Sequence, residues 1–183
     1  MHIIKRGDKI KMKTWQIIST IISIILGTLL HFTYQLSGEN KIVAVFSAVN
    51  ESTWEHLKLA FWGIIIMAII GKFVVKKQIS NYWTAQVAGI LTAISFITIF
   101  FYTYTGILGK NFGIFNIILF IIAMILGGYV IYKIMDNPKD LKAEGISILF
   151  IIIVLFSFIL YTFSPPEIAY FKDPIDGTYG VGK

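Results

Sequence analysis

Residues 50–58 (Asn-Glu-Ser-Thr-Trp-Glu-His-Leu-Lys) bring two carboxylates, an imidazole and an ammonium close together at the start of an apolar segment. Such groups can do chemistry: Glu55 or Glu51 could serve as a general base, and His56 as an acid, a base or a metal ligand. Ionisable side chains are costly to insert at membrane depth, so a cluster of them there indicates a function. The catalytic candidates are therefore Glu55, His56 and Glu51.

His31, at the end of the preceding apolar segment, is the second histidine with a candidate role. Each histidine lies at one end of a row of mostly small side chains spaced by three or four residues, which lets two membrane helices approach closely. If the two rows face each other, the imidazoles meet near the outer surface, within about 10 Å or through a shared metal ion or water. The rows are Ser19, Ser23 and Gly27 for His31, and Ala60, Gly63, Met67 and Gly71 for His56.

Two histidines and one carboxylate can hold zinc or another divalent ion, so His31, His56 and Glu55 form the expected metal set. Glu55 is favoured over Glu51 because it adjoins His56 and lies one turn deeper. A haem clamped by both histidines is a less favoured cofactor. The spacing matches neither His-Glu-x-x-His nor Glu-x-x-His, so it does not identify the metal. The expected supporting residues are Tyr34, Gln35, Asn50, Lys58, Tyr102 and Asn116.

The same residues also have a purely structural interpretation. Ser52-x-x-Glu55 is a capping box, in which Ser52 accepts from the amide of Glu55 and Glu55 reaches back to the amide of Ser52. Glu51 then only complements the helix dipole. Lys58 either pairs with a carboxylate or extends its ammonium to the membrane surface. Both interpretations stay open at the level of the sequence.

Long apolar runs dominate the rest of the 183-residue chain, which is 56% hydrophobic and only 14% charged. Runs of about 20 apolar residues match the bilayer core. They must be helical, because lipid offers the backbone no hydrogen-bond partners. The sequence therefore predicts an all-α fold, an integral membrane bundle of five transmembrane helices at about 14–36, 53–75, 83–105, 112–134 and 145–164.

Lysine and arginine set the expected orientation, because they concentrate in cytoplasmic segments. With the N-terminus inside, 11 of the 16 fall in inner segments and 5 in outer ones. The inner set is Lys5, Arg6, Lys9, Lys11, Lys13, Lys72, Lys76, Lys77, Lys133, Lys139 and Lys142, and the outer set is Lys41, Lys58, Lys110, Lys172 and Lys183.

This bias predicts an N-inside, C-outside protein in three parts. Residues 1–13 form a basic cytoplasmic N-terminus, residues 14–164 the membrane domain, and residues 165–183 an extracellular tail that is either a cap over the polar site or disordered. The positive charges flank the apolar runs, so the expected partner is the lipid bilayer rather than nucleic acid. The chain has no cysteine, which excludes disulfides, thiolate metal sites and a cysteine nucleophile.

Four segments together resemble one protein family: His31-Phe32, residues 49–61, Pro165-Pro166 and residues 173–180. The chain resembles an uncharacterised family of small multi-pass membrane proteins from Gram-positive, clostridia-like bacteria, with the motif Asn-Glu-Ser-x-Trp-Glu-His-Leu-Lys. It departs from that pattern at Ala48, where a proline is expected. The resemblance implies a bacterial cell membrane and carries no activity with it.

Three functions remain open. The favoured one is binding or transport of a metal ion or small solute at an outward-facing His/Glu site, because the polar groups exceed what simple packing needs. A membrane enzyme acting on a lipid or peptide at the outer leaflet is the second, although no known catalytic spacing supports it. The third is a structural or regulatory subunit whose polar cluster locks helices together.

Overall fold

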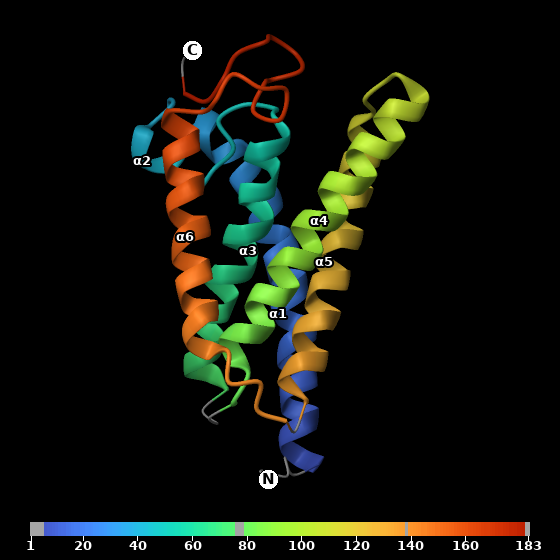
Figure 1. Ribbon diagram of the computed structural model, residues 1–183, viewed down its shortest axis with the longest axis vertical. Coiled ribbons are helices and arrows are strands. Elements are labelled where there is room, and N and C mark those ends of the chain that lie inside the picture. The colour runs from blue at the N-terminus through green and yellow to red at the C-terminus, as the bar shows by residue number, and fades with distance from the viewer. Residues whose placement is uncertain (1–5, 76–78, 138, 182–183) are drawn as a thin grey trace.

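The computed structural model describes residues 6–75, 79–137 and 139–181, which form a bundle of helices (Figure 1). Five helices in this part of the chain are long and apolar enough to cross a membrane, which confirms the predicted all-helical fold. They are α1 (Arg6–Leu36), α3 (Thr53–Val74), α4 (Tyr82–Leu108), α5 (Gly113–Met135) and α6 (Glu144–Phe163), and a short helix, α2 (Lys41–Ala44), lies between α1 and α3.

Helix α3 is the centre of the bundle. Of its most apolar stretch 61% is buried, against at most 33% in each other long helix. Helix α4 begins beside the start of α6, where the hydroxyl of Ser147 donates to that of Thr84 at 3.2 Å, and it crosses the bundle to form a hairpin with α5 on the side away from α6 (Figure 1). At one end of the bundle the tips of α4 and α5 diverge from the remaining helices (Figure 1).

Helices α1 and α3 approach closely along the two rows of small residues. The hydroxyl of Ser23 donates to the carbonyl oxygen of Gly63 at 2.8 Å. A Cβ atom at Gly63 would lie only 2.7 Å from the carbonyl oxygen of Ser23, so this position needs glycine. The rows therefore face each other as the spacing predicts, and they carry His31 and His56 to the same end of the bundle.

The connection from α1 to α3 folds back against the end of α1. Asn40 caps α2 by accepting from the amide of Ile42 at 2.8 Å. The hydroxyl of Ser47 accepts from the amide of Tyr34 at 2.9 Å and donates to the carbonyl oxygen of Leu30. These bonds fix the loop that leads into α3.

Residues 165–181 fold onto the end of α3 and α6 instead of extending away. The amide of Val181 donates to the carbonyl oxygen of Thr162 at 2.9 Å, and the amide of Trp54 donates to that of Tyr170 at 3.2 Å. The ring of Phe171 packs against Trp54 with ring centroids 4.9 Å apart. The tail is therefore an ordered part of this end of the molecule.

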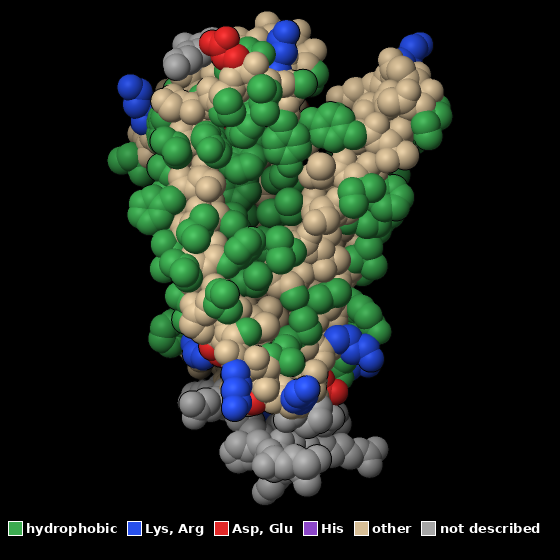
Figure 2. Space-filling model, in the orientation of Figure 1, with side chains coloured by type: hydrophobic (Ala, Val, Ile, Leu, Met, Phe, Trp, Pro, Cys, Tyr) green, Lys and Arg blue, Asp and Glu red, His purple; other side chains and the backbone are tan. Residues whose placement is uncertain are grey.

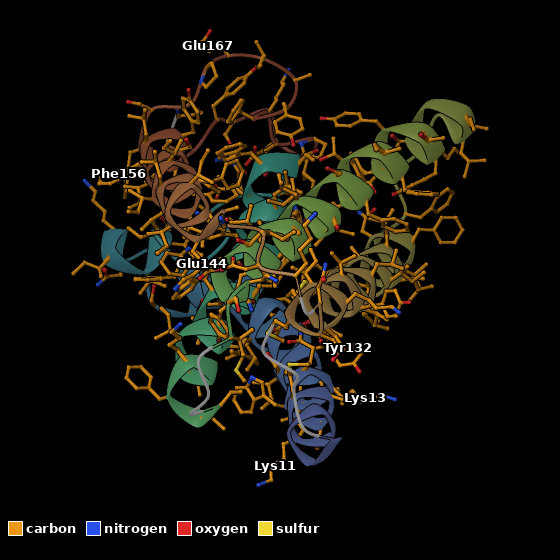
Figure 3. The ribbon with its side chains drawn as sticks, turned by 60° about the horizontal axis from the view of Figure 1, so that its bottom comes forward. Lys11, Lys13, Tyr132, Glu144, Phe156 and Glu167 are labelled. Carbon is orange, nitrogen blue, oxygen red and sulfur yellow. The ribbon has the colours of Figure 1, made fainter. Side chains whose placement is uncertain are left out.

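The surface has an apolar belt between two charged ends on the face that Figure 2 shows. Lys11 and Lys13 lie at the N-terminal end of α1, and Glu167 lies at the opposite end of the bundle (Figure 3). This layout fits a chain that crosses a bilayer, and the orientation stays a prediction. Four residues of the charge argument lie outside the described ranges: Lys5, Lys76, Lys77 and Lys183.

Candidate metal centre

His31, Glu51 and His56 bring three donor atoms to one point where α1 meets the start of α3. The two Nε2 atoms lie 3.3 Å apart, which confirms that the two imidazoles meet. The Glu51 carboxylate lies 3.6 Å from His31 Nε2 and 3.4 Å from His56 Nε2. We call these three residues the metal triad, because one atom from each could contact the same ion.

His56 is oriented by the backbone one turn before it. Its Nδ1 lies 2.8 Å from the carbonyl oxygen of Ser52. A carbonyl oxygen only accepts, so Nδ1 must carry the hydrogen. In the neutral imidazole Nε2 then holds a lone pair that points toward His31 and Glu51, as in metal-bound histidines, whereas in the imidazolium Nε2 also carries a hydrogen that it can donate to Glu51.

Glu51 lies just before α3 and is positioned by the tail. Its backbone N–H donates to Oδ2 of Asp173 at 2.8 Å. Oδ1 of Asp173 accepts from the amide of Ile175 at 2.7 Å, which holds the carboxylate within its own turn. The amide of Ser52 donates to Oδ1 of Asn50 at 3.0 Å, which shapes the loop on both sides of Glu51.

Electrostatics keep the Glu51 carboxyl ionised. Hydrogen bonds from His31 and His56 hold its pKa well below the usual range for glutamate. The triad is reachable from solvent, since 27% of each imidazole and 39% of the Glu51 side chain are exposed. Two Nε2 lone pairs and a carboxylate at this distance would repel each other, and either a hydrogen on one Nε2 or a metal ion among the three groups removes that repulsion.

The structure separates Glu55 from the triad, although it adjoins His56 in the sequence. Its Oε2 lies 2.6 Å from Nζ of Lys58 and accepts from the amide of Val49 at 3.1 Å. Its Oε1 accepts from the hydroxyl of Thr162 at 3.0 Å. Consecutive helical residues point about 100° apart, so Glu55 and Lys58 share a face directed at α6 while His56 faces α1. Glu51, rather than the expected Glu55, is thus the carboxylate beside the histidines.

Lys58 is fully buried, so its ammonium does not extend to the surface of the protein. Its ammonium donates to the carbonyl oxygen of Ala44 at 2.7 Å and to the hydroxyl of Thr162 at 2.8 Å, in addition to the Glu55 ion pair. All three hydrogens therefore have partners. The pair joins α3 to α6 and to the end of α2, which is a structural role.

The capping box forms only in part. The hydroxyl of Ser52 accepts from the amide of Glu55 at 3.4 Å, as the motif predicts. The predicted return hydrogen bond, from the amide of Ser52 to the Glu55 carboxylate, does not form. The amide of Ser52 donates to Asn50 instead, and the Glu55 carboxylate turns toward Lys58. The ion pair within one turn outcompetes the backbone amide for this carboxylate.

A cavity of about 290 Å³ opens beside the triad, bounded by α1, α3, α4 and α5. Figure 2 shows a notch between the diverging tip of α4 and α5 and the body of the molecule. All three triad residues line this cavity. The other lining residues are Gly27, Thr28, Phe32, Thr53, Leu59, Ile97, Phe101, Asn111, Gly113, Asn116, Ile117, Leu119 and Phe120.

The supporting residues expected from the sequence divide between this cavity and other places. Asn116 lines the cavity, where its Nδ2 donates to Oδ1 of Asn111 at 2.8 Å. Tyr102 bonds to Thr53 of the cavity wall at 3.2 Å between their hydroxyl oxygens. Tyr34 and Gln35 are not among the described residues that line the cavity.

Sequence reasoning missed Asn111 and the tail residue Asp173. Asn111 lies in the loop between α4 and α5, where no helical period relates it to other positions. Asp173 stands in a turn signal, Asp173-Pro174, but nothing local shows which distant amide its carboxylate accepts from. A polar residue flanking an apolar run is the only sequence signal for either one.

Comparison with known proteins adds a family and no function. No curated protein and no solved structure matches the chain. One family model matches residues 4–181, a range that contains the whole triad and residues 165–181 of the tail. The chain therefore belongs to DUF6512, a family of unknown function.

Proposed function

We propose that this membrane protein binds one divalent transition-metal ion, with zinc as the best fit, through His31, Glu51 and His56. The separations of the three donor atoms carry the proposal. Zinc holds nitrogen and oxygen ligands at about 2.0–2.2 Å, so neighbouring ligands of a tetrahedral ion lie roughly 3.3–3.6 Å apart. The two Nε2 atoms lie 3.3 Å apart, and the nearest Glu51 oxygens, Oε1 to His31 and Oε2 to His56, lie 3.6 and 3.4 Å from them. One ligand atom from each residue lies within 4.8 Å of the others, so a small turn of the Glu51 carboxylate would bring a single oxygen to the tetrahedral spacing.

The donor types support a transition metal. Two imidazole nitrogens and one carboxylate suit zinc, iron, nickel or copper, whereas magnesium and calcium prefer oxygen ligands throughout. The arrangement disfavours haem. Axial nitrogens on one iron would lie about 4 Å apart with the macrocycle between them. The Glu51 carboxylate, next to both Nε2 atoms, occupies the space that a macrocycle would need.

Three protein ligands leave a tetrahedral ion one further position. Structural zinc sites are closed by four protein ligands, whereas catalytic sites keep a position for water or substrate. The triad lines a cavity, so the fourth position would face it. This observation favours a second candidate function, a membrane metalloenzyme acting near the outer leaflet, in which an ion held by His31, Glu51 and His56 would lower the pKa of a bound water to about 7 and so supply a nucleophile.

The location of the site follows from the charge pattern. We propose an N-inside, C-outside protein in the cell membrane of a Gram-positive bacterium, with the triad facing outward. The lysine and arginine bias supports the orientation, and the resemblance to clostridia-like proteins supports the membrane.

Metal analysis of the purified protein tests the binding function. We expect about one zinc ion per chain after exposure to zinc and removal of excess metal, and an affinity at least about 100-fold lower in His31→Ala, Glu51→Gln and His56→Ala. Glu167→Gln is the matched control, because it removes one exposed acidic charge at the same end of the bundle. Wild-type affinity in Glu51→Gln would contradict the proposal.

A further inference from the structure

The cavity beside the triad combines two kinds of wall. Near one end lie the triad and the amides of Asn111 and Asn116. The remaining walls carry mainly hydrocarbon, from Phe32, Leu59, Ile97, Phe101, Ile117 and Phe120. Its volume of about 290 Å³ is near the lower limit for small-molecule sites. A cavity with one polar end and apolar walls suits an amphiphile, a molecule with a polar headgroup and an apolar chain.

The length of the cavity suits a chain. Its α5 wall runs from Gly113 to Phe120, which corresponds to about 10 Å along a helix. The ring of Phe120 closes the inner end against Gly27, where a Cβ atom would lie 2.6 Å from Cζ of Phe120. A chain that enters from the outer end would stop at this contact.

The charge of the polar end selects the headgroup. Among the described residues that line the cavity, none is lysine or arginine, and Glu51 is the one carboxylate. A divalent ion on the triad would leave a net charge of about +1, because Glu51 neutralises one of its two charges. That charge matches one anionic oxygen group, which would take the open position on the metal.

The tip of α4 and α5, which contributes Asn111, Gly113 and Asn116 to the cavity lining, also carries exposed apolar side chains. On the diverging tip of α4 and α5, the side chains of Leu108, Phe112 and Ile114 are exposed by 50%, 40% and 61%. These helices are membrane-span candidates, so the tip would meet lipid chains or headgroups. An amphiphile can therefore reach the cavity from the bilayer without its chain crossing water.

We propose that this cavity binds a single-chain amphiphile, with its chain between α3, α4 and α5 and its anionic carboxylate on the metal ion. The inference rests on the proposed metal site for its headgroup contact. The chain contact rests on the cavity walls alone. Free fatty acid and a single-chain lipid bearing a carboxylate share this chemistry.

Photo-crosslinking with dodecanoate that carries a diazirine near the chain end tests the proposal on purified, zinc-loaded protein. We expect saturable labelling of cavity residues on α3 and α5, competed by unlabelled dodecanoate. Competition should be about tenfold weaker for zinc-free protein and for dodecanol, which lacks the anionic headgroup. A carboxylated single-chain lipid as competitor separates the two sources: stronger competition than dodecanoate indicates the lipid, and weaker competition indicates the free acid.

Two neighbouring residues on α5 provide matched variants. Ile117 lines the cavity and is 57% exposed, whereas Ile118 lies outside the cavity lining and is 47% exposed. Ile117→Trp should reduce labelling at least about tenfold with its zinc content unchanged, and Ile118→Trp should leave both unchanged. Ile117→Phe replaces the tryptophan variant if that one does not accumulate.

The outcomes distinguish the two proposals. If the protein binds zinc but the labelling is not competed and is spread over lipid-facing residues, the amphiphile proposal is overturned and the metal-site proposal stands. Full labelling in Ile117→Trp would do the same. Wild-type protein that takes up no zinc would overturn the metal site and the headgroup contact together.

Discussion

Glu51 and Glu55 have the same side chain and opposite surroundings. Glu51 is partly exposed and lies next to two imidazoles, so it is accessible to an ion from solvent. Glu55 is buried, and both of its oxygens already accept from Lys58, Thr162 or the Val49 amide. Replacing each by glutamine should therefore separate metal binding from stability.

Glu55→Gln should destabilise the protein, because it leaves the buried ammonium of Lys58 without its counter-charge. Breaking a buried ion pair by removing one partner costs about 3–5 kcal/mol. We expect a lower midpoint of thermal unfolding in detergent, with stoichiometric zinc still bound below that midpoint. The double variant Glu55→Gln/Lys58→Met should recover part of the loss, because no unpaired charge remains. Unfolding of Glu55→Gln at the wild-type temperature would refute a structural role for this pair.

This ranking of the two carboxylates reverses the one favoured by sequence position. Adjacency to His56 and greater depth pointed to Glu55. The buried position of Glu55 instead favours an ion pair with Lys58, which is also buried and lies one helical turn away on the same face of α3. Sequence spacing shows which helical residues share a face, but it does not show what a neighbouring helix presents to that face.

At the level of helices, the length of the apolar runs and the helical period of the small residues were sufficient to predict most of the architecture. Most ends of the five predicted spans lie within a few residues of the corresponding helix ends. The rows of small residues on α1 and α3 meet at Ser23 and Gly63, as their spacing predicts. The third donor of the triad could not be predicted in this way. Glu51 precedes α3 in an irregular loop, where its direction depends on Asp173, 122 positions away in the sequence.

Gly63→Ala tests whether the close approach of α1 and α3 holds the triad together. Its new Cβ would lie 2.7 Å from the backbone oxygen of Ser23, so the helices must separate. We expect a loss of about 1–3 kcal/mol of stability and weaker zinc binding, since His31 and His56 lie on the separated helices. Gly106→Ala in α4 is the control, because no described neighbour lies within 4 Å of a Cβ there. A zinc affinity equal to wild type in Gly63→Ala would show that the triad does not depend on this contact.

The tail acts on the site through a single carboxylate. Asp173→Ala removes the acceptor of the Glu51 amide and should lower zinc affinity by about 10- to 100-fold, as expected when an outer-shell contact is lost. Asp176→Ala removes an acidic residue three positions later, whose Oδ1 accepts from the amide and the hydroxyl of Thr178 within the tail itself, and this variant should bind zinc normally. Equal zinc affinities for the two variants would mean that the tail does not position Glu51.

At the scale of the whole molecule, the triad lies where two tightly packed helices meet a diverging hairpin. Packing of α1 against α3 fixes two of the donors, and the divergence of α4 and α5 opens the cavity beside them. The triad and the cavity therefore share one end of the bundle. The charge bias predicts that this end faces outward.

A reporter enzyme fused after Lys183 measures that orientation in cells. The 11-to-5 bias of lysine and arginine predicts activity of a reporter that works only outside the membrane. The same fusion with a reporter that works only in the cytoplasm should be inactive. The opposite pair of results would mean that the orientation is reversed and that the triad faces the cytoplasm.

The most direct test of the central claim is X-ray absorption at the zinc edge of the zinc-loaded protein. We expect about four light ligands at about 2.0–2.2 Å, with the scattering pattern of two imidazoles, and loss of that pattern in His31→Ala and His56→Ala. A spectrum of about six oxygen ligands without imidazole scattering, or one unchanged in both variants, would contradict a metal centre at His31, Glu51 and His56.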